Sequence, residues 1–422
     1  MKATITQRGA KRATPLLGLI VAAAGILIAG TLAGSAPAAA APAAAAPAAA
    51  AQTRTYYIAV DEVAWDYAPT NSNQITSEPF DDTANVFVQQ GPDRIGKVYT
   101  KALYREYTNA SFKNPKPVPA EWQHLGSLGP IIRAEVGDTI KVVFRNNATF
   151  PFSVHPHGVF YEKDSEGAPY NDGTSGANKA DDAVPPGATH TYNWAVPERA
   201  GPGPMDPSSI LWAYHSHTDE VADTNAGLIG PIIITRKGMA RKDGTPTDVD
   251  REFVTLYTVF NENNSLYLDQ NIQAFAGDPA TVDPDDPDFQ ESNLMHSING
   301  YVYGNGPLGA MTMKKGERVR WYVMGMGTEV DLHTPHWHGN TLLWSGMRSD
   351  MVELLPMSMK TLDMQPDDVG TWLFHCHVND HLSAGMVTRF VVTQETHRRI
   401  RCGCRGPAVG PRQSAWRHHR TV

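Results

Sequence analysis

The feature that most constrains the fold of this chain is an internal repeat of paired histidines. His-Pro-His-Gly at 155–158 matches His-Trp-His-Gly at 336–339, and Trp-Ala-Tyr-His-Ser-His at 212–217 matches Trp-Leu-Phe-His-Cys-His at 372–377. An apolar closing segment follows the second motif in both copies. The repeat predicts two copies of one domain, whose equivalent positions can be compared.

Both copies have the local pattern of β-structure. Short β-branched and aromatic runs, such as TYYIAV at 55–60 and EFVTLYTVF at 252–260, alternate with Gly, Pro, Asn and Asp, and no long segment has helical periodicity. A polar stretch with Gly and Pro at 237–250 divides the two blocks. The sequence therefore predicts an all-β chain with β-sandwich domains at 52–236 and 247–396.

The two ends differ from this body in composition. Residues 1–36 are basic and then apolar, which predicts a secretory signal peptide; an uncleaved membrane anchor is the alternative, because the apolar stretch is long. Residues 37–51 are an Ala/Pro-rich linker, and 397–422 form a basic tail that we expect to be disordered. We therefore expect a secreted or extracytoplasmic protein, tethered to the membrane if the anchor is retained. The sequence assigns no role to the tail or to its Cys402 and Cys404.

The charge distribution argues against nucleic acid as a partner. Eleven of the 36 basic residues lie in the first 12 and last 26 positions, which hold no acid, so 25 basic residues oppose 44 acidic ones in 13–396, a net charge of −19. Such a body favours cationic ligands. Three cysteines cannot form a disulfide framework, so the hydrophobic core must supply the stability.

Four histidine pairs carry the strongest chemical signal. An H-x-H sequence on a strand places both imidazoles on one face, with Cα atoms about 7 Å apart, which suits one metal or two neighbouring metals. A single pair would also fit a solvated strand, but eight imidazoles in two copies need partners, which metal ions supply. The eight residues are His155, His157, His215, His217, His336, His338, His375 and His377.

A second signal is the cysteine between two of these histidines. On a strand, Cys376 points to the face opposite its neighbours and can meet His333, His381 and Met386. Two histidines, a cysteine and a weak axial methionine are the ligands of a blue-copper electron-transfer site. The first copy has other residues at the equivalent positions: Phe152, Ser216, Val221 and Ala226. Only the second copy is therefore expected to hold this mononuclear site.

These motifs resemble those of ceruloplasmin-like members of the multicopper oxidase family. Similar segments include GPIIRAEVGD, ADDAVPPG, YHSH, GLIGPIII, ESNLMHSING and TWLFHCHVNDHLSAGM, and the resemblance covers roughly residues 55–395. Ceruloplasmin has six domains, whereas this chain has two. The resemblance implies two cupredoxin-like Greek-key sandwiches.

The resemblance also implies four copper ions in each functional unit. The type 1 copper would be held by His333, Cys376, His381 and Met386. The type 2 copper would be held by His155 and His336. The type 3 pair would be held by His157, His215, His217, His338, His375 and His377. The implied reaction is one-electron oxidation of a reducing substrate at type 1 and four-electron reduction of O₂ to water at the trinuclear cluster.

Asp172 matches an acid near the family's copper cluster. It follows the first H-x-H in an Asn-Asp-Gly sequence and, by the resemblance, would relay protons to oxygen. A plain turn residue is the alternative interpretation.

The resemblance further suggests an electron donor. Glu291, His296 and Asp380 match a family site that holds iron beside the type 1 copper, so Fe(II) is the favoured substrate. An incidental acidic loop explains the same residues. A laccase-like phenol oxidase is the second possibility, and a Cu(I) oxidase that uses the Met-rich segment 311–386 is the third.

Assembly and calcium are two further expectations. Because each domain supplies four of eight cluster histidines, the cluster must lie at a domain interface, either within one chain or between chains. The six domains of ceruloplasmin form a ring, so the resemblance implies that three copies of this chain can make the same ring, and we expect a homotrimer with clusters between subunits. Asn178, Asp181 and Asp182 match a calcium-holding segment of the family, with a solvated acidic loop as the alternative.

Three other functions fit less well. A scaffold protein would not need the full set of ligands, and copper storage would not need a single cysteine between two histidines. A two-domain nitrite reductase shares the fold and the trimer, but its blue-copper site lies in the first domain.

Overall fold

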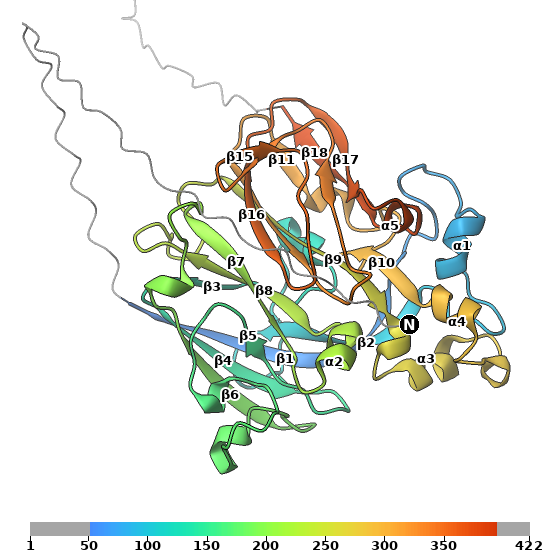
Figure 1. Ribbon diagram of the computed structural model, residues 1–422, viewed down its shortest axis with the longest axis horizontal. Helices are drawn as coiled ribbons and strands as arrows, with labels where there is room; N and C mark the ends of the chain where they lie inside the picture. The colour runs from blue at the N-terminus through green and yellow to red at the C-terminus, as the bar shows by residue number, and fades with distance from the viewer. Residues whose placement is uncertain (1–50, 395–422) are drawn as a thin grey trace, which may run out of the picture. The chain divides into compact units, whose positions relative to one another are not determined.

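The computed structural model describes residues 51–394. The predicted signal peptide, nearly all of the Ala/Pro-rich linker and the basic tail lie outside the described residues. We call residues 51–236 the first half and 247–394 the second half. In Figure 1 the first half runs from blue to green and the second from yellow to red.

The first half consists of two four-stranded sheets. The strands of one sheet, in spatial order, are β2 (Val98–Tyr107), β1 (Thr53–Asp66), β4 (Thr139–Asn146) and β6 (Thr189–Ala195). The strands of the other are β3 (Ile132–Glu135), β8 (Ile229–Thr235), β7 (Ser209–His215) and β5 (His155–Pro156). One parallel pair in each sheet, β1 with β4 and β3 with β8, requires a crossover connection.

The second half also has two sheets. The strands of the larger sheet, in spatial order, are β10 (Leu294–Ile298), β9 (Arg251–Asn261), β12 (Val319–Gly325), β16 (Met359–Met364), β14 (Leu342–Trp344) and β15 (Met347–Ser349). The strands of the smaller sheet are β11 (Thr312–Lys314), β18 (Val387–Thr393), β17 (Gly370–Cys376) and β13 (Pro335–Trp337). The prediction of an all-β fold is confirmed.

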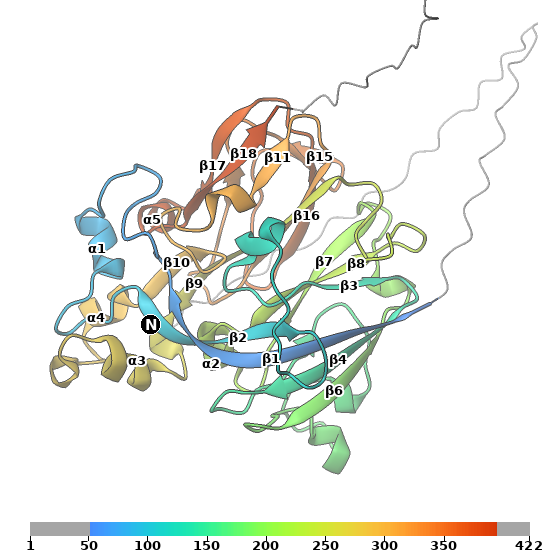
Figure 2. The same ribbon diagram turned by 180° about the vertical axis from the view of Figure 1, so that it is seen from behind.

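Helices are short and lie in the connections. The α-helices are α1 (Asp82–Val88), α2 (Glu220–Ala226), α3 (Leu268–Phe275), α4 (Pro287–Ser292) and α5 (Asn379–Ser383). The 3₁₀ turns are η1 (Ala120–Leu125), η2 (Lys163–Ser165), η3 (Gly176–Lys179), η4 (Glu198–Ala200), η5 (Glu262–Asn264), η6 (Pro279–Thr281) and η7 (Leu308–Ala310). Helix α1 packs against α4, and Figures 1 and 2 both show them side by side. Within residues 51–394, no helix is both long and apolar enough to cross a membrane.

Three hydrophobic cores separate the four sheets into successive layers. Strand alternation in β7 sends Ile210 and Tyr214 into the core shared with β1 and β4, and Leu211 and Ala213 into a second core shared with β9 and β12. A third core lies between the β9 sheet and the β17 sheet and contains Cys376. The β9 sheet therefore lies between the two sheets that carry the histidine motifs.

Buried polar groups join the two halves. The Lys101 ammonium and the Glu262 carboxylate form an ion pair whose side chains are both fully buried. Arg133 of β3 pairs with Glu252 of β9 at 3.0 Å. Because buried charges are costly without partners, these contacts hold β2 and β3 of the first half against η5 and β9 of the second half.

Candidate copper sites

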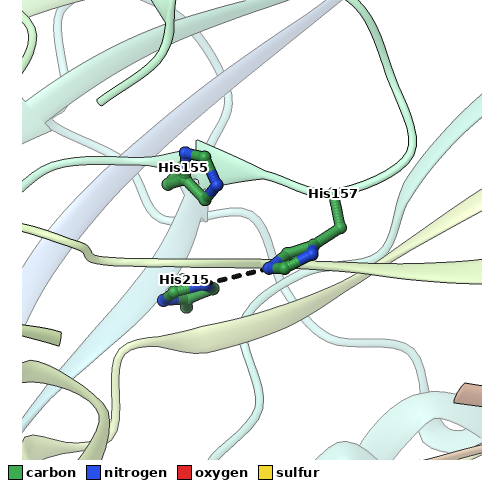
Figure 3. A group of neighbouring side chains, drawn as sticks. All are labelled: His155, His157 and His215. Atoms are coloured by element: carbon green, nitrogen blue, oxygen red, sulfur yellow. Dashed lines mark hydrogen bonds between the residues drawn. The ribbon is translucent and has the colours of Figure 1, made fainter. Parts of the chain in front are cut away.

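Strand pairing brings the first-half histidines together. His155 of β5 pairs with His215 at the end of β7, and His157 follows two residues after His155. The Nε2 atoms of His157 and His215 lie 3.1 Å apart, and the centre of the His217 ring lies 5.1 Å from that of His155. Figure 3 shows the His157 and His215 rings pointing toward each other. We call these four residues the first half-cluster.

The second half repeats this arrangement. His336 of β13 pairs with His375 of β17, the Nε2 atoms of His338 and His375 lie 3.0 Å apart, and the His377 ring lies 5.3 Å from that of His336. We call these four residues the second half-cluster. Two equivalent strand pairs thus produce the same convergence of imidazoles.

The glycine and tryptophan of the repeated motifs shape each half-cluster. Gly158 has φ +72°, and a Cβ there would lie within 2.4 Å of three ring atoms of Trp212. Gly339 has φ +65°, and a Cβ there would lie 2.5 Å from the Trp372 ring. Both positions need glycine because the indole covers the backbone directly after the H-x-H pair.

Hydrogen bonds leave nitrogen lone pairs pointing at each other. His215 donates from Nδ1 to the Ser216 carbonyl at 3.0 Å, and His375 donates from Nδ1 to the Cys376 carbonyl at 2.8 Å. Their Nε2 atoms therefore carry lone pairs. Burial lowers the pKa of His157 to about 4 and that of His215 to about 3, so both rings are neutral at pH 7. Neutral imidazoles that converge in this way fit a bound metal cation.

A third group of potential metal ligands converges around Cys376. The Sγ atom lies 3.9 Å from His333 Nδ1 and 3.7 Å from His381 Nδ1, and these two nitrogens are 3.1 Å apart. All three side chains are buried, and Met386 is buried in the same core. Burial raises the pKa of the Cys376 thiol, so a bound cation would be needed to stabilise the thiolate. The two histidines and the cysteine, which we call the Cys376 site, fit a soft copper ion.

Comparisons with known proteins agree with this geometry. Two multicopper oxidase models match residues 124–238 and 278–396, together more than half of the chain. The chain belongs to the multicopper oxidase family. It contains the two cupredoxin-like domains and, in its family, copper is the cofactor.

Relatives within this family are similar over most of the chain. Ferroxidase HEPHL1 of Mus musculus is 47% identical over 85% of this chain and 30% of its own length. Homo sapiens hephaestin and ceruloplasmin are each 45% identical over 81% of this chain, and over 29% and 32% of their own lengths. The chain thus spans about 30% of the curated relatives it matches.

Solved structures show the same fold. Two solved multicopper oxidases have a TM-score of 0.50 at 18% identity, over 81% of this chain and 89% and 86% of their own chains. At 18% identity the similarity supports a shared fold and no shared function.

In this multicopper oxidase the two half-clusters are separate within one chain. They lie on the β7 and β17 sheets, with the β9 sheet between them. Among residues 51–394, no metal-binding group of three or more side chains mixes histidines of the two halves. Within the described residues, each half of the chain therefore gathers its own histidines separately.

Hydrogen bonds fill the place in the first half that is equivalent to the Cys376 site. Ser216 stands where the second half has Cys376, and it donates from Oγ to Asp223 Oδ2 at 2.6 Å. The Ser153 amide donates to the same Oγ at 3.0 Å. Burial raises the pKa of Asp223 to about 6. The first half thus has a hydrogen-bonded serine and aspartate in place of the cysteine.

The structure places Asp172 in a lysine-rich loop. Its carboxylate oxygens lie 3.1 Å from the ammonium groups of Lys163 and Lys179, and it accepts a hydrogen bond from Thr174 Oγ1 at 2.7 Å. The Thr174 amide and these lysines lower the pKa of Asp172, which keeps it ionised at neutral pH. Its predicted role in proton relay stays a prediction.

Two carboxylates contact the half-clusters although the sequence analysis did not identify them. Glu220 Oε2 lies 3.3 Å from His217 Nε2, and Asp350 Oδ2 lies 3.5 Å from His336 Nε2. The three-residue spacing between His217 and Glu220 at the start of α2 could have indicated the first. The second depends on β13 lying beside the segment that follows β15, which no local pattern indicates.

The predicted iron ligands lie on three elements, β10, α4 and α5. His296 of β10 is buried, its ring lies 5.3 Å from that of His381, and its Nδ1 donates to the Leu294 carbonyl, which leaves Nε2 free. Glu291 lies on α4 and Asp380 on α5, and both are exposed. Of the three, His296 is the one whose ring packs against a predicted copper ligand, His381.

The predicted calcium loop contains its own cation. The Lys179 ammonium lies 3.1 Å from both Asp172 and Asp182, and it donates to the Tyr170 carbonyl at 2.8 Å. Asp181 accepts from the Gly167 amide at 2.7 Å through one oxygen. Lys179 would have to move before calcium could bind between these carboxylates.

Proposed function

We propose that this chain is a ferroxidase in which Fe(II) gives electrons to a type 1 copper at the Cys376 site. The histidines of the two half-clusters would hold three further copper ions, which makes four in all, and O₂ would be reduced to water there. Copper supplies the one-electron steps and the binding of oxygen. The observation that carries the proposal is the direct covalent and hydrogen-bonded connection between Cys376 and a histidine of the second half-cluster. The relatives named as ferroxidases support it.

The chain itself supplies the electron path. Cys376 is bonded in sequence to His375, and the Cys376 carbonyl accepts a hydrogen bond from His375 Nδ1 at 2.8 Å. The sulfur of Cys376 is therefore joined to the His375 ring in two ways. One path follows the backbone bonds, and the shorter one crosses the hydrogen bond from His375 Nδ1 to the Cys376 carbonyl. The surrounding core excludes water, since Cys376 and Phe374 are fully buried.

Assembly completes the cluster. Because each chain has two separated half-clusters, the second half-cluster of one chain would meet the first half-cluster of the next. Three chains joined head to tail can close into a ring with three equal interfaces. The length of the relatives supports this, because each is about three times the aligned part of this chain.

The electron donor is proposed from the position of His296. Its ring is packed between those of His381 and Phe87, so an ion held by its free nitrogen would lie close to a type 1 ligand. Exposed carboxylates on Glu291 and Asp380 would complete an oxygen-rich site, and the net charge of −19 over residues 13–396 would attract cations.

Oxygen consumption by copper-loaded protein tests this function. We would compare wild type, Glu291→Ala/His296→Ala and the matched control Asp288→Ala, which removes an exposed acid from the same helix. Fe(II) turnover should fall at least about tenfold in the double variant and stay near wild type in the control. Phenol turnover should survive in both. Equal loss of Fe(II) turnover in the control would mean that the loop acts only by its charge.

The same assay separates the alternatives. Strong phenol turnover with unaffected Fe(II) oxidation would identify a laccase-like enzyme. Preference for Cu(I), lost when the exposed Met347 is changed to Leu, would identify a Cu(I) oxidase. Absence of oxygen consumption with retained copper would favour storage.

Calcium at Asn178, Asp181 and Asp182, proton relay by Asp172, and export by the N-terminal segment remain predictions. The first two concern the loop that Lys179 neutralises, and the third lies outside the described residues. Asp172→Asn should slow oxygen reduction without changing the blue absorption if the relay is correct.

A further inference from the structure

Asp331 is a buried carboxylate in contact with the Cys376 site. Its side chain is 2% exposed. Oδ1 lies 3.1 Å from His333 Nε2 and also accepts the Val259 amide at 2.7 Å, while Oδ2 accepts the Thr328 amide at 2.8 Å. Three donors therefore hold one carboxylate, and one of them is a predicted type 1 ligand.

The geometry fixes which nitrogen of His333 faces the sulfur. Nδ1 lies 3.9 Å from Cys376 Sγ and 3.1 Å from His381 Nδ1, so Nε2 is on the far side of the ring, next to Asp331. A carboxylate only accepts, so Nε2 must carry the hydrogen and Nδ1 must keep its lone pair. Asp331 thus selects the tautomer that a metal at the Cys376 site requires.

The backbone is shaped to hold this carboxylate in place. Gly327 has φ +125°, and a Cβ there would lie 2.0 Å from Asp331 Oδ2. The Asp331 amide closes a turn by donating to the Thr328 carbonyl at 3.0 Å, and Val259 ties the carboxylate to the central strand β9. Gly327 and the amides of Val259 and Thr328 therefore hold the Asp331 carboxylate in one orientation.

The internal repeat provides an independent comparison. At the same 181-residue offset that aligns the H-x-H pairs, Asp331 and His333 correspond to Phe150 and Phe152. The first half lacks the carboxylate and the histidine together. A carboxylate that served only to close the turn would have no reason to disappear with the ligand.

We propose that Asp331 is a positioning residue for the type 1 copper, which it serves by holding His333 and making its Nδ1 a stronger donor. The inference rests on the proposed function, because it assumes copper at the Cys376 site. A stronger donor stabilises Cu(II) over Cu(I). Loss of the carboxylate should therefore weaken Cu(II) binding and raise the reduction potential.

Asp331→Asn tests this proposal in the full copper-loaded protein. The matched control is Asp138→Asn, because Asp138 is also buried and accepts two backbone amides, from Gln52 at 2.9 Å and Glu135 at 3.0 Å, but lies in the first half. We expect Cu(II) affinity, read from the blue band during chelator competition, to fall 10- to 100-fold in Asp331→Asn only. If Cu(I) affinity is unchanged, each tenfold loss raises the potential by about 59 mV.

A second variant keeps the test decisive if Asp331→Asn does not fold. Gly327→Ala leaves the carboxylate in the chain but forces it to move, so it should change the potential in the same direction. Wild-type affinity and potential in a folded Asp331 or Gly327 variant would overturn the proposal. A wild-type protein without a blue band would instead overturn the proposed function.

Discussion

Mixing two inactive variants should restore activity if the copper cluster is built between chains. His157→Ala removes one ligand of the first half-cluster, and His338→Ala removes the equivalent ligand of the second. Each residue supplies one of the paired Nε2 atoms, at 3.1 Å and 3.0 Å from its neighbour. Either variant alone should therefore have almost no oxygen reduction.

The size of the recovery follows from the separation of the half-clusters. Each interface would join the second half of one chain to the first half of the next. An intact cluster requires a His157→Ala chain on one side and a His338→Ala chain on the other. Random assembly of equal amounts gives about one quarter intact clusters over all trimers, and a trimer that contains both variants has one intact cluster among its three interfaces. The chain that supplies the intact second half also keeps its own Cys376, so the electron path is complete.

The assay needs mixed oligomers of known composition. The two variants would be co-expressed with different affinity tags, purified through both tags, loaded with copper and measured for oxygen consumption. As a control, His157→Ala would be mixed with the His157→Ala/His338→Ala double variant, which cannot form an intact cluster. We expect no recovery in that control.

The result that would refute this reasoning is a doubly tagged oligomer without activity. A monomer in light scattering that reduces oxygen at the wild-type rate would refute it equally. Either outcome would mean that the two half-clusters meet within one chain, against the layer order of the sheets.

Three further predictions concern stability. Lys101→Met should lower the free energy of unfolding of the copper-free protein by about 3–5 kcal/mol, because it leaves Glu262 buried without its cation; urea denaturation checks this, and addition of Glu262→Leu should restore part of the loss. Asp223 has a folded-state pKa of about 6, above its unfolded value, so its stabilising contribution is present below about pH 4 and is lost as pH rises to 6. Asp223→Asn should remove about 3 kcal/mol of that pH dependence in urea titrations at several pH values. If calcium binds the Asp182 loop, a calcium chelator should lower the thermal midpoint and calcium, but not copper, should restore it; no change would assign the loop to Lys179 alone.

Much of the fold could be predicted because its signals are local and duplicated. Period-two alternation identifies strands, and the two copies of each histidine motif give the same pattern twice. The structure brings His333 and His381 to Cys376 although 43 residues separate His333 from the cysteine, as the strand alternation around Cys376 led us to expect. Side-chain direction on a strand is set by parity, so a sequence is enough to group such residues.

The groups around the ligands could not be predicted in the same way. Asp350 reaches His336 only because β13 lies beside the segment after β15, and Lys179 reaches Asp182 only because a loop folds back on itself. Asp331 lies two residues before His333, but its role depends on amides from Thr328 and the distant Val259. Contacts of this kind depend on register and loop geometry, which residue spacing does not specify.

The order of the sheets explains why duplication kept eight cluster histidines but one cysteine. A trinuclear cluster needs ligands from two surfaces, and the β9 sheet keeps the two histidine-bearing sheets of one chain apart. If the cluster forms between chains, as proposed, both copies must keep their four histidines, since each would serve a different interface. The type 1 ligands come from one domain, and the hydrogen bond between Ser216 and Asp223 fills the equivalent place in the other. A head-to-tail ring would then have one electron entry for each cluster, always on the second-half side of the interface. The second half would thus collect electrons singly, and the first half would only complete the site where oxygen takes them.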